Sequence, residues 1–413
     1  MRMQLLTVLV AAAVSCSCPT IGAVYNLKVV TDASPDYSDL DSMIQSITSR
    51  WETPAEKCWA LFYWNHIARR QCTPMVLHGL ACTDPIRQFN DYGYTMCSTI
   101  SGINCAIWDA MGLPAKYWDI TNHTVCEVQY DGRWHMYDNS LSAIYTLCDG
   151  RTIAGVEDIG RTGACAASRG KEEPGHIAKY HCLTATSANG FLTGSDTTRD
   201  LDQEYRCFNP NGLMYRPYFY DWDRGHRYIL NLRHGESYVR HYQKQGDGPE
   251  YYVPNGGKDP DDGRFGLRGN GLRAWEPRLT AEGLKQDTES LVNVRAAATG
   301  GVVPARAGQP AEIVFRVEGA NVVTSVVISA DVSRDTEADA ASMAVSTTNG
   351  LTWSQVWEAE RTGRQTIDLK LVELVNGAYE VLVKLALKGQ ADAIHARLWN
   401  IRFETVTMLN AKT

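Results

Sequence analysis

The sequence lacks several features that mark common classes of protein. It has no long basic run and a formal net charge of −7, which argues against nucleic acid as a partner. It has no C-x-x-C pair, so neither a zinc ribbon nor a thioredoxin motif is expected. No segment after the N-terminus is long and apolar enough to cross a bilayer. The 413 residues, 44% of them hydrophobic, suit a globular protein of about two to three domains.

The first residues resemble an export signal. Arg2 gives the start a positive charge, and the apolar stretch from Leu5 to Val14 is too short to span a membrane. Cleavage after Ala23 would release a secreted, periplasmic or cell-surface protein. As an alternative, Cys16 lies in a segment that loosely resembles a bacterial lipoprotein box and could carry a lipid anchor.

Cysteine is absent from residues 208–413, although the chain has 12 cysteines. Two of them lie in the signal region, and the other ten fall between Cys58 and Cys207, so the composition changes where a new domain would begin. Cys72 and Cys82 bracket a short loop and are the expected disulfide, which an exported chain allows. The spacing alone does not fix the connectivity of the other cysteines.

Hydrophobic periodicity and turn residues predict an α+β N-terminal half. Thr53 to Glu56 form a capping box with proline at the first helical position. Helices are expected over residues 39–47, 53–70 and 97–111, a loop over 71–96, and strands over 115–119, 123–130 and 133–138.

The C-terminal part has an all-β pattern. Apolar runs alternate with turn signals such as Asn349-Gly350 and Asn376-Gly377, a spacing typical of a β-sandwich. The expected strands cover residues 312–317, 322–328, 366–371, 379–385 and 398–403. The predicted organisation is a signal peptide (1–23), a catalytic domain (24–205), an aromatic-rich β/linker region (206–289) and a β-sandwich (290–413).

Cys97 is the first candidate catalytic residue, because it stands at the start of the helix over 97–111. The free N–H groups and the dipole of a helix N-terminus stabilise a thiolate, which is the nucleophilic form of cysteine. A disulfide-bonded or simply buried Cys97 is the structural alternative.

A hairpin supplies the other two candidates. Asp131-Gly132 is a two-residue turn, which pairs Tyr130 with Arg133 and Val128 with His135. Alternation then puts His123 and Asp138 on one face as diagonal neighbours and His135 on the other face. His123 would deprotonate Cys97, and Asp138 would orient His123. A strand histidine satisfied by a neighbour and a turn-capping aspartate are the alternatives, and Glu127 is expected to be structural.

These motifs resemble the transglutaminase-like superfamily of papain-type cysteine enzymes. The chain shows Cys97, then His123-x-x-x-Glu127-Val128, then Asp131-Gly132 and Trp134-x-x-x-Asp138, in the order of the family pattern over roughly residues 40–150. The resemblance implies a Cys-His-Asp triad that acts on peptide or amide bonds through a thioester without a cofactor. Family members often carry Gly and Trp where this chain has Thr95 and Val125, which leaves the oxyanion contacts open. Asn90, Tyr94 and Gln88 are the candidate donors.

The sequence therefore predicts a secreted cysteine hydrolase or acyl transferase with a protein or peptide substrate and no metal. The alternative is an idle scaffold whose β-sandwich contacts a glycan, a protein or the cell surface. Three further patterns have structural interpretations that we prefer: an aromatic run, an acidic loop and an Asp-box-like turn. They comprise Tyr215, Tyr218, Phe219, Tyr220, Trp222 and Tyr228; Asp259, Asp261 and Asp262; and Ser346 to Trp353.

Overall fold

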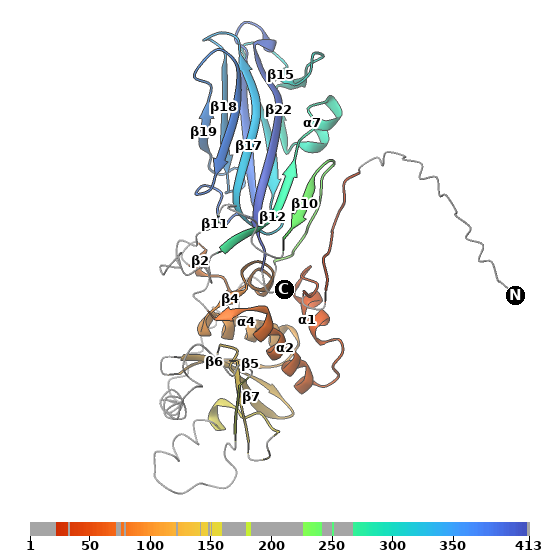
Figure 1. Ribbon diagram of the computed structural model, residues 1–413, viewed down its shortest axis with the longest axis vertical. Coiled ribbons are helices and arrows are strands. Elements are labelled where there is room, and N and C mark those ends of the chain that lie inside the picture. The colour runs from red at the N-terminus through yellow and green to blue at the C-terminus, as the bar shows by residue number, and fades with distance from the viewer. Residues whose placement is uncertain are drawn as a thin grey trace, which may run out of the picture.

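The protein has a β-sandwich at one end, helices in the middle and a small sheet at the other end (Figure 1). The computed structural model describes residues 22–31, 34–71, 76–77, 80–120, 123–140, 142–147, 149, 151–158, 179–182, 226–241, 250–251 and 267–410. Two hydrophobic cores form, one within residues 37–144 and one within residues 275–403.

The N-terminal half contains the three predicted helices. They are α1 (Leu40–Thr48), α2 (Pro54–Ala68) and α4 (Cys97–Ala110). Thr53 and Glu56 form the expected capping box at the start of α2, and Asp39 caps α1 by accepting a bond from the Ser42 amide. The caps fix where the first two helices begin.

The stretch predicted as loop holds several short elements instead. They are β1 (Arg70–Gln71), β2 (Val76–Leu77), β3 (Leu80–Ala81), α3 (Pro85–Arg87), the π-helical turn η1 (Gln88–Tyr92) and β4 (Tyr94–Thr95). Parallel pairing of β4 with β1 ties the residues just before Cys97 to the end of α2. The elements are too short for periodicity to reveal them.

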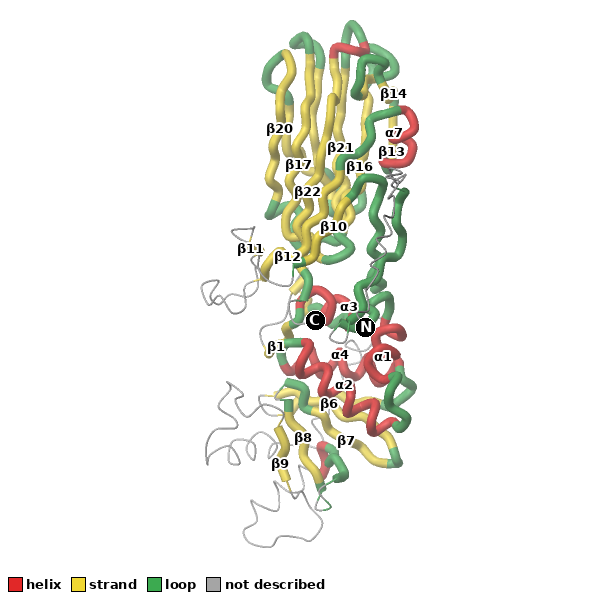
Figure 2. Tube along the Cα trace, turned by 45° about the vertical axis from the view of Figure 1, so that its right-hand side comes forward, coloured by secondary structure: helices red, strands yellow, loops and turns green. Residues whose placement is uncertain are grey.

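A three-stranded antiparallel sheet lies against the helices (Figure 2). Its strands are β5 (Ala115–Ile120), β6 (His123–Tyr130) and β7 (Arg133–Tyr137). Tyr130 pairs with Arg133 and Val128 with His135, so the predicted register is confirmed. Asp131 and Gly132 have φ angles of 50° and 73°, as a two-residue hairpin turn requires. Nearby, β8 (Ala143–Thr146) pairs with β9 (Lys179–Cys182).

The C-terminal β-sandwich is confirmed. One sheet contains β10 (Ser237–Arg240), β11 (Glu250–Tyr251), β12 (Leu267–Trp275), β14 (Val294–Ala296), β15 (Val302–Pro304), β17 (Val322–Arg334), β20 (Gly363–Leu371) and β22 (Ala396–Met408). The facing sheet contains β13 (Ser290–Val292), β16 (Ala311–Glu318), β18 (Ala340–Ser346), β19 (Ser354–Glu358) and β21 (Glu380–Lys388). The short helix α7 (Ala281–Asp287) precedes β13. Alternating strand residues such as Ile313 and Phe315 fill the core between the sheets.

The predicted aromatic-rich region joins this sandwich, because β10 pairs with β12 and β12 with β22. Within this region residues 237–240 form β10, whereas residues 228–232 make only an isolated bridge, between Leu232 and Val24. The Asp-box-like segment is a structural turn, in which Thr348 Oγ1 accepts a bond from the Thr352 amide at 2.9 Å.

The sandwich docks directly onto the turn that leads to Cys97. The Asn321 amide and the Tyr379 hydroxyl each donate to the Asp91 carboxyl at 2.5 Å. Asn410 donates its side chain to the carbonyls of Ala68 (2.7 Å) and Phe89 (2.8 Å). The segment before the candidate nucleophile is therefore held between two domains.

Two further findings concern the cysteines and the membrane. Cys82 is a buried free thiol, so the expected Cys72–Cys82 disulfide is not formed; Cys72 itself lies outside the described residues. Of the helices in the described ranges, none has the length and apolarity needed to cross a membrane.

Candidate functional site

Cys97 forms no disulfide, stands at the first position of α4 and is partly exposed. Met96 precedes it in an extended conformation, and no side chain caps the helix, so the first N–H groups face the region of the sulfur. Among the cysteine side chains that the structure describes, the others are buried: Cys58, Cys82, Cys105 and Cys126. Burial raises the pKa of Cys58 and Cys82 to about 12. Only Cys97 of this set has both access and a helix N-terminus.

His123 is the first residue of β6 and pairs with Ile120. The next residue, Thr124, accepts a hydrogen bond through its carbonyl from Ser101 Oγ at 3.2 Å. Ser101 lies one turn after Cys97 on α4, so the backbone of His123 is close to the first turn of that helix. The His123 side chain lies outside the described part of the chain.

The register of the hairpin also limits how the two residues can meet. Helix α4 packs on the sheet face formed by Cys126, Val128 and Tyr137. Alternation gives His123 to the other face, together with Val125 and Glu127. The predicted triad therefore requires the start of α4 and the backbone of His123 to approach each other at the end of β6.

Asp138 follows β7 and is 1% exposed. Its backbone exchanges two hydrogen bonds with Ala143, which fix the chain just beyond the strand. Burial lowers the pKa of Arg69 to about 10, and the negative charges of Asp138 and of ionised Cys97 act against that decrease. Arg69 therefore interacts electrostatically with two of the three predicted triad residues, Asp138 and Cys97.

A buried polar network that the sequence did not reveal surrounds this arginine. The Arg69 guanidinium donates to Asn65 Oδ1 (2.8 Å), Gln71 Oε1 (3.0 Å) and the carbonyls of Thr95 (3.3 Å) and Asn139. Its one sequence signal is the i, i+4 spacing of Asn65 and Arg69 at the end of an otherwise apolar helix.

Asn104 extends the network from α2 to α4 and the end of β7. It accepts from Asn65 Nδ2 at 3.1 Å and donates to Asn139 Oδ1 at 2.6 Å. A buried network of this kind fixes the relative positions of the elements it joins. The helix that begins with Cys97 and the strand that leads to Asp138 are thus held together.

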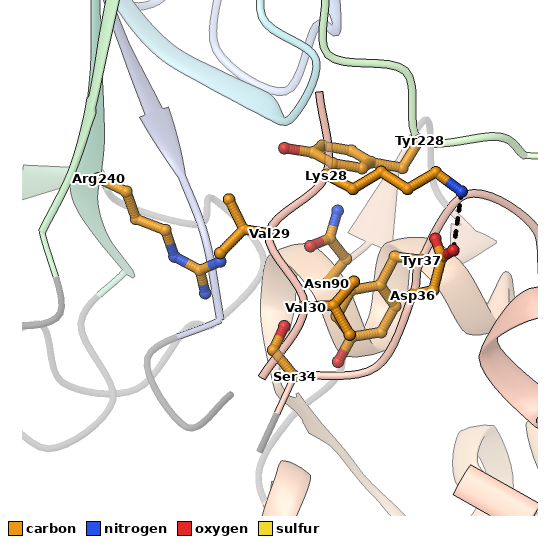
Figure 3. A pocket seen from close by; sticks show the side chains of 9 residues that line it. All are labelled: Lys28, Val29, Val30, Ser34, Asp36, Tyr37, Asn90, Tyr228 and Arg240. Atoms are coloured by element: carbon orange, nitrogen blue, oxygen red, sulfur yellow. Dashed lines mark hydrogen bonds and ion pairs between the residues drawn. The ribbon is translucent and has the colours of Figure 1, made fainter. Parts of the chain in front are cut away.

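Of the three candidate oxyanion donors, Asn90 and Gln88 have described side chains, and both lie in η1. Asn90 lines a depression, which Lys28 and the β10 residue Arg240 also line (Figure 3). The depression holds about 280 Å³, a volume that includes open solvent, and none of the predicted triad residues lines it. Gln88 is fully buried in η1, and the side chain of Tyr94 lies outside the described atoms.

Glu127 and His135 have structural partners. Glu127 accepts from Trp118 Nε1 and from the Val156 amide, both at 2.9 Å, and burial raises its pKa. His135 stacks on Tyr130 with a centroid distance of 3.8 Å and contacts the Ile153 carbonyl through Nδ1 at 2.7 Å. Burial lowers the pKa of His135. Both residues support the sheet.

Several predicted features lie outside the described residues. They are Cys16, Tyr215, Tyr218, Phe219, Tyr220, Trp222, Asp259, Asp261 and Asp262. Tyr228 is described and packs against the N-terminal core. No group of three or more potential metal ligands occurs in the ranges that the structure covers.

Comparisons with known proteins name no family for this chain. No family model and no curated protein matches it. A carbohydrate-binding module of a laminarinase from Zobellia galactanivorans aligns at 13% identity and a TM-score of 0.21, over 32% of this chain and 98% of that one. Arthrobacter globiformis isomalto-dextranase aligns at 11% identity and a TM-score of 0.22, over 32% of this chain and 23% of the enzyme. Similarity at this level identifies neither function nor ligand.

Proposed function

We propose that the protein is a cysteine hydrolase or acyl transferase of the transglutaminase-like type, acting on peptide or amide bonds. The observation that carries the proposal is the position of Cys97. A partly exposed thiol that forms no disulfide begins α4 next to the strand that starts with His123. The buried carboxylate of Asp138 follows the adjacent strand.

The chemistry follows from these three groups. His123 takes the proton of the Cys97 thiol, and the sulfur attacks the carbonyl carbon of the substrate. The tetrahedral intermediate collapses when the imidazolium gives its proton to the leaving amine, which leaves a thioester on Cys97. Water or a second amine then attacks the thioester, loses its proton to His123 and releases the acid or a new amide. The sulfur regains its proton, and Asp138 holds the imidazole in the required tautomer.

The test is labelling with a peptidyl chloromethyl ketone, followed by mass-spectrometric mapping of the alkylated residue. The wild type should be modified at Cys97, and His123→Ala should lower the rate about 100-fold or more. His135→Ala is the matched control, because this second histidine of the hairpin is bound to structural partners. Equal labelling of all three proteins, or modification away from Cys97, would refute the proposal.

A second candidate function concerns the outer face of the sandwich sheet. Asp331 on β17 accepts from Thr366 Oγ1 (2.7 Å), Arg364 (2.7 Å) and Asn400 (2.8 Å), which lower its pKa to about 2. The indole of Trp399 lies beside them, with the Arg364 guanidinium 4.9 Å from its ring centroid. We propose that this face contacts a glycan, because hydroxyl groups need donors and acceptors and a sugar ring packs on an aromatic surface.

Native affinity electrophoresis in gels that contain soluble polysaccharides tests this second function. Retardation of the wild type should be lost in Trp399→Ala and kept in Leu351→Ser, a control at a side chain that is 87% exposed elsewhere on the sandwich. Wild-type mobility that no polysaccharide alters would exclude the glycan contact.

A further inference from the structure

Arg69 is a buried charge held almost entirely by neutral groups. It follows α2, is 5% exposed, and donates to two side-chain amides and two backbone carbonyls. These carbonyls belong to Thr95, two residues before Cys97, and Asn139, one residue after Asp138. One side chain therefore binds the backbone next to both residues.

The sandwich shows the usual treatment of a buried arginine. Arg273 is 1% exposed and forms an ion pair with Glu236 at 2.8 Å. Burial of an uncompensated charge is costly, so a carboxylate partner is the common solution. Arg69 instead has hydrogen bonds to neutral oxygens, while Asp138 and Cys97 interact with it through the field.

Burial and the neighbouring negative charges shift the pKa of Arg69 in opposite directions. Burial lowers the pKa of Arg69 to about 10, and the negative forms of Asp138 and Cys97 act against that decrease. The guanidinium remains charged at neutral pH. Because the guanidinium binds the Thr95 carbonyl, two residues before Cys97, its positive charge lies beside the nucleophile segment and favours the thiolate of Cys97, and burial strengthens this attraction.

We propose that Arg69 is a positioning residue for the Cys97 nucleophile: it ties the Thr95–Cys97 segment to the end of β7 and stabilises the thiolate with its positive charge. The proposal rests on the proposed function, since it describes how Cys97 is prepared for attack. It adds a second cation to the imidazolium of His123, one that the fold supplies and that is charged at neutral pH.

A purely structural arginine would hold the same segments without affecting the sulfur. Charge and shape can be separated by Arg69→Lys, which keeps the charge and loses the fork of donors, and Arg69→Gln, which removes the charge. Arg273→Gln is the matched control, because it removes another buried arginine far along the chain from Cys97.

The experiment measures the rate of Cys97 alkylation by iodoacetamide against pH, with mapping of the modified residue and circular dichroism as a check on folding. Arg69→Gln should raise the alkylation midpoint by about one to three pH units, which is a roughly 10- to 1,000-fold loss of rate below the midpoint. Arg69→Lys should restore part of the shift, and Arg273→Gln should leave the midpoint unchanged. An unchanged midpoint in folded Arg69→Gln would overturn the proposal.

A second variant keeps the test decisive if Arg69→Gln does not fold. In His123→Ala, the Cys97 midpoint should stay below the ordinary cysteine pKa of about 8.5, because Arg69 still supplies a positive charge. A midpoint at or above that value would contradict the role of Arg69. If His123→Ala instead behaves as wild type, the catalytic triad fails while the effect of Arg69 stands, so the two failures are distinguishable.

Discussion

The two halves of the molecule bury polar groups in different ways. In the sandwich, alternation sends apolar side chains such as Ile328 and Phe403 inward and polar ones outward, and the buried Arg273 is paired with Glu236. In the N-terminal half, Arg69 and three asparagines form a network among helices and strands. The first arrangement needs only a stable core. The second fixes the positions of polar groups around Cys97 and Asp138, as a reactive site requires.

The largest expected effect is on catalysis, which the account assigns to the N-terminal half. Cys97→Ala should lower hydrolysis of an activated ester or amide by about 1,000-fold or more, since the nucleophile is removed from a position that contributes little to the core. Cys58→Ala is the control, because Cys58 is a fully buried thiol on α2. The measurement is steady-state turnover. Retained activity in Cys97→Ala would remove the catalytic distinction between the halves.

The next largest effect is on stability, at the contact between the N-terminal half and the sandwich. Gly93 and Gly132 have nearly equal positive φ angles of 69° and 73°. A Cβ at Gly93 would lie 2.1 Å from Asn410 Oδ1, whereas one at Gly132 would meet nothing within 4 Å. Gly93→Ala should therefore displace Asn410 from its two carbonyl partners and cost about 3 kcal/mol or more of unfolding free energy.

Gly132→Ala should cost only about 1 kcal/mol, the price of the backbone conformation alone. Urea denaturation of the two variants gives the comparison. Equal losses would mean that the contact of Asn410 with the turn before Cys97 contributes little to stability.

The last prediction is a pH dependence of stability at the same contact, which is small per pH unit. Asp91 is buried at the contact with the sandwich, and burial raises its pKa to about 7, against the bonds from Asn321 and Tyr379. The folded state therefore binds a proton that the unfolded state releases near pH 4. The unfolding free energy should fall as the pH rises from about 4 to 7, by at most about 1.4 kcal/mol per unit. Subtracting the stability curve of Asp91→Asn from that of the wild type isolates this slope, and parallel curves would exclude it.

Sequence patterns were sufficient for the elements that periodicity defines. The helices over 39–47, 53–70 and 97–111, the hairpin register set by Asp131-Gly132 and the five predicted sandwich strands follow from spacing and turn residues, whereas sandwich strands such as β18 and β19 were not predicted. Strand β17 is longer than expected, since it continues to Arg334 across a bulge.

The remaining features depend on tertiary contacts that spacing does not encode. The turn η1 forms where Asp91 meets Asn321 and Tyr379, more than 200 residues away. Arg69 was predicted only as part of the end of a helix, because the i, i+4 spacing of Asn65 and Arg69 does not show that the arginine is buried among neutral partners. The predicted Cys72–Cys82 disulfide was wrong, since a separation of ten positions in the chain says nothing about the directions of the two side chains.

The most direct test of the account is to look for the acyl-enzyme itself. Incubation with p-nitrophenyl acetate, rapid acid quench and peptide mass spectrometry would show which side chain carries the acetyl group. We expect a thioester on Cys97 that turns over in the wild type and is formed far more slowly in His123→Ala. Acetyl groups only on other side chains, with Cys97 unmodified in the folded protein, would contradict the central claim.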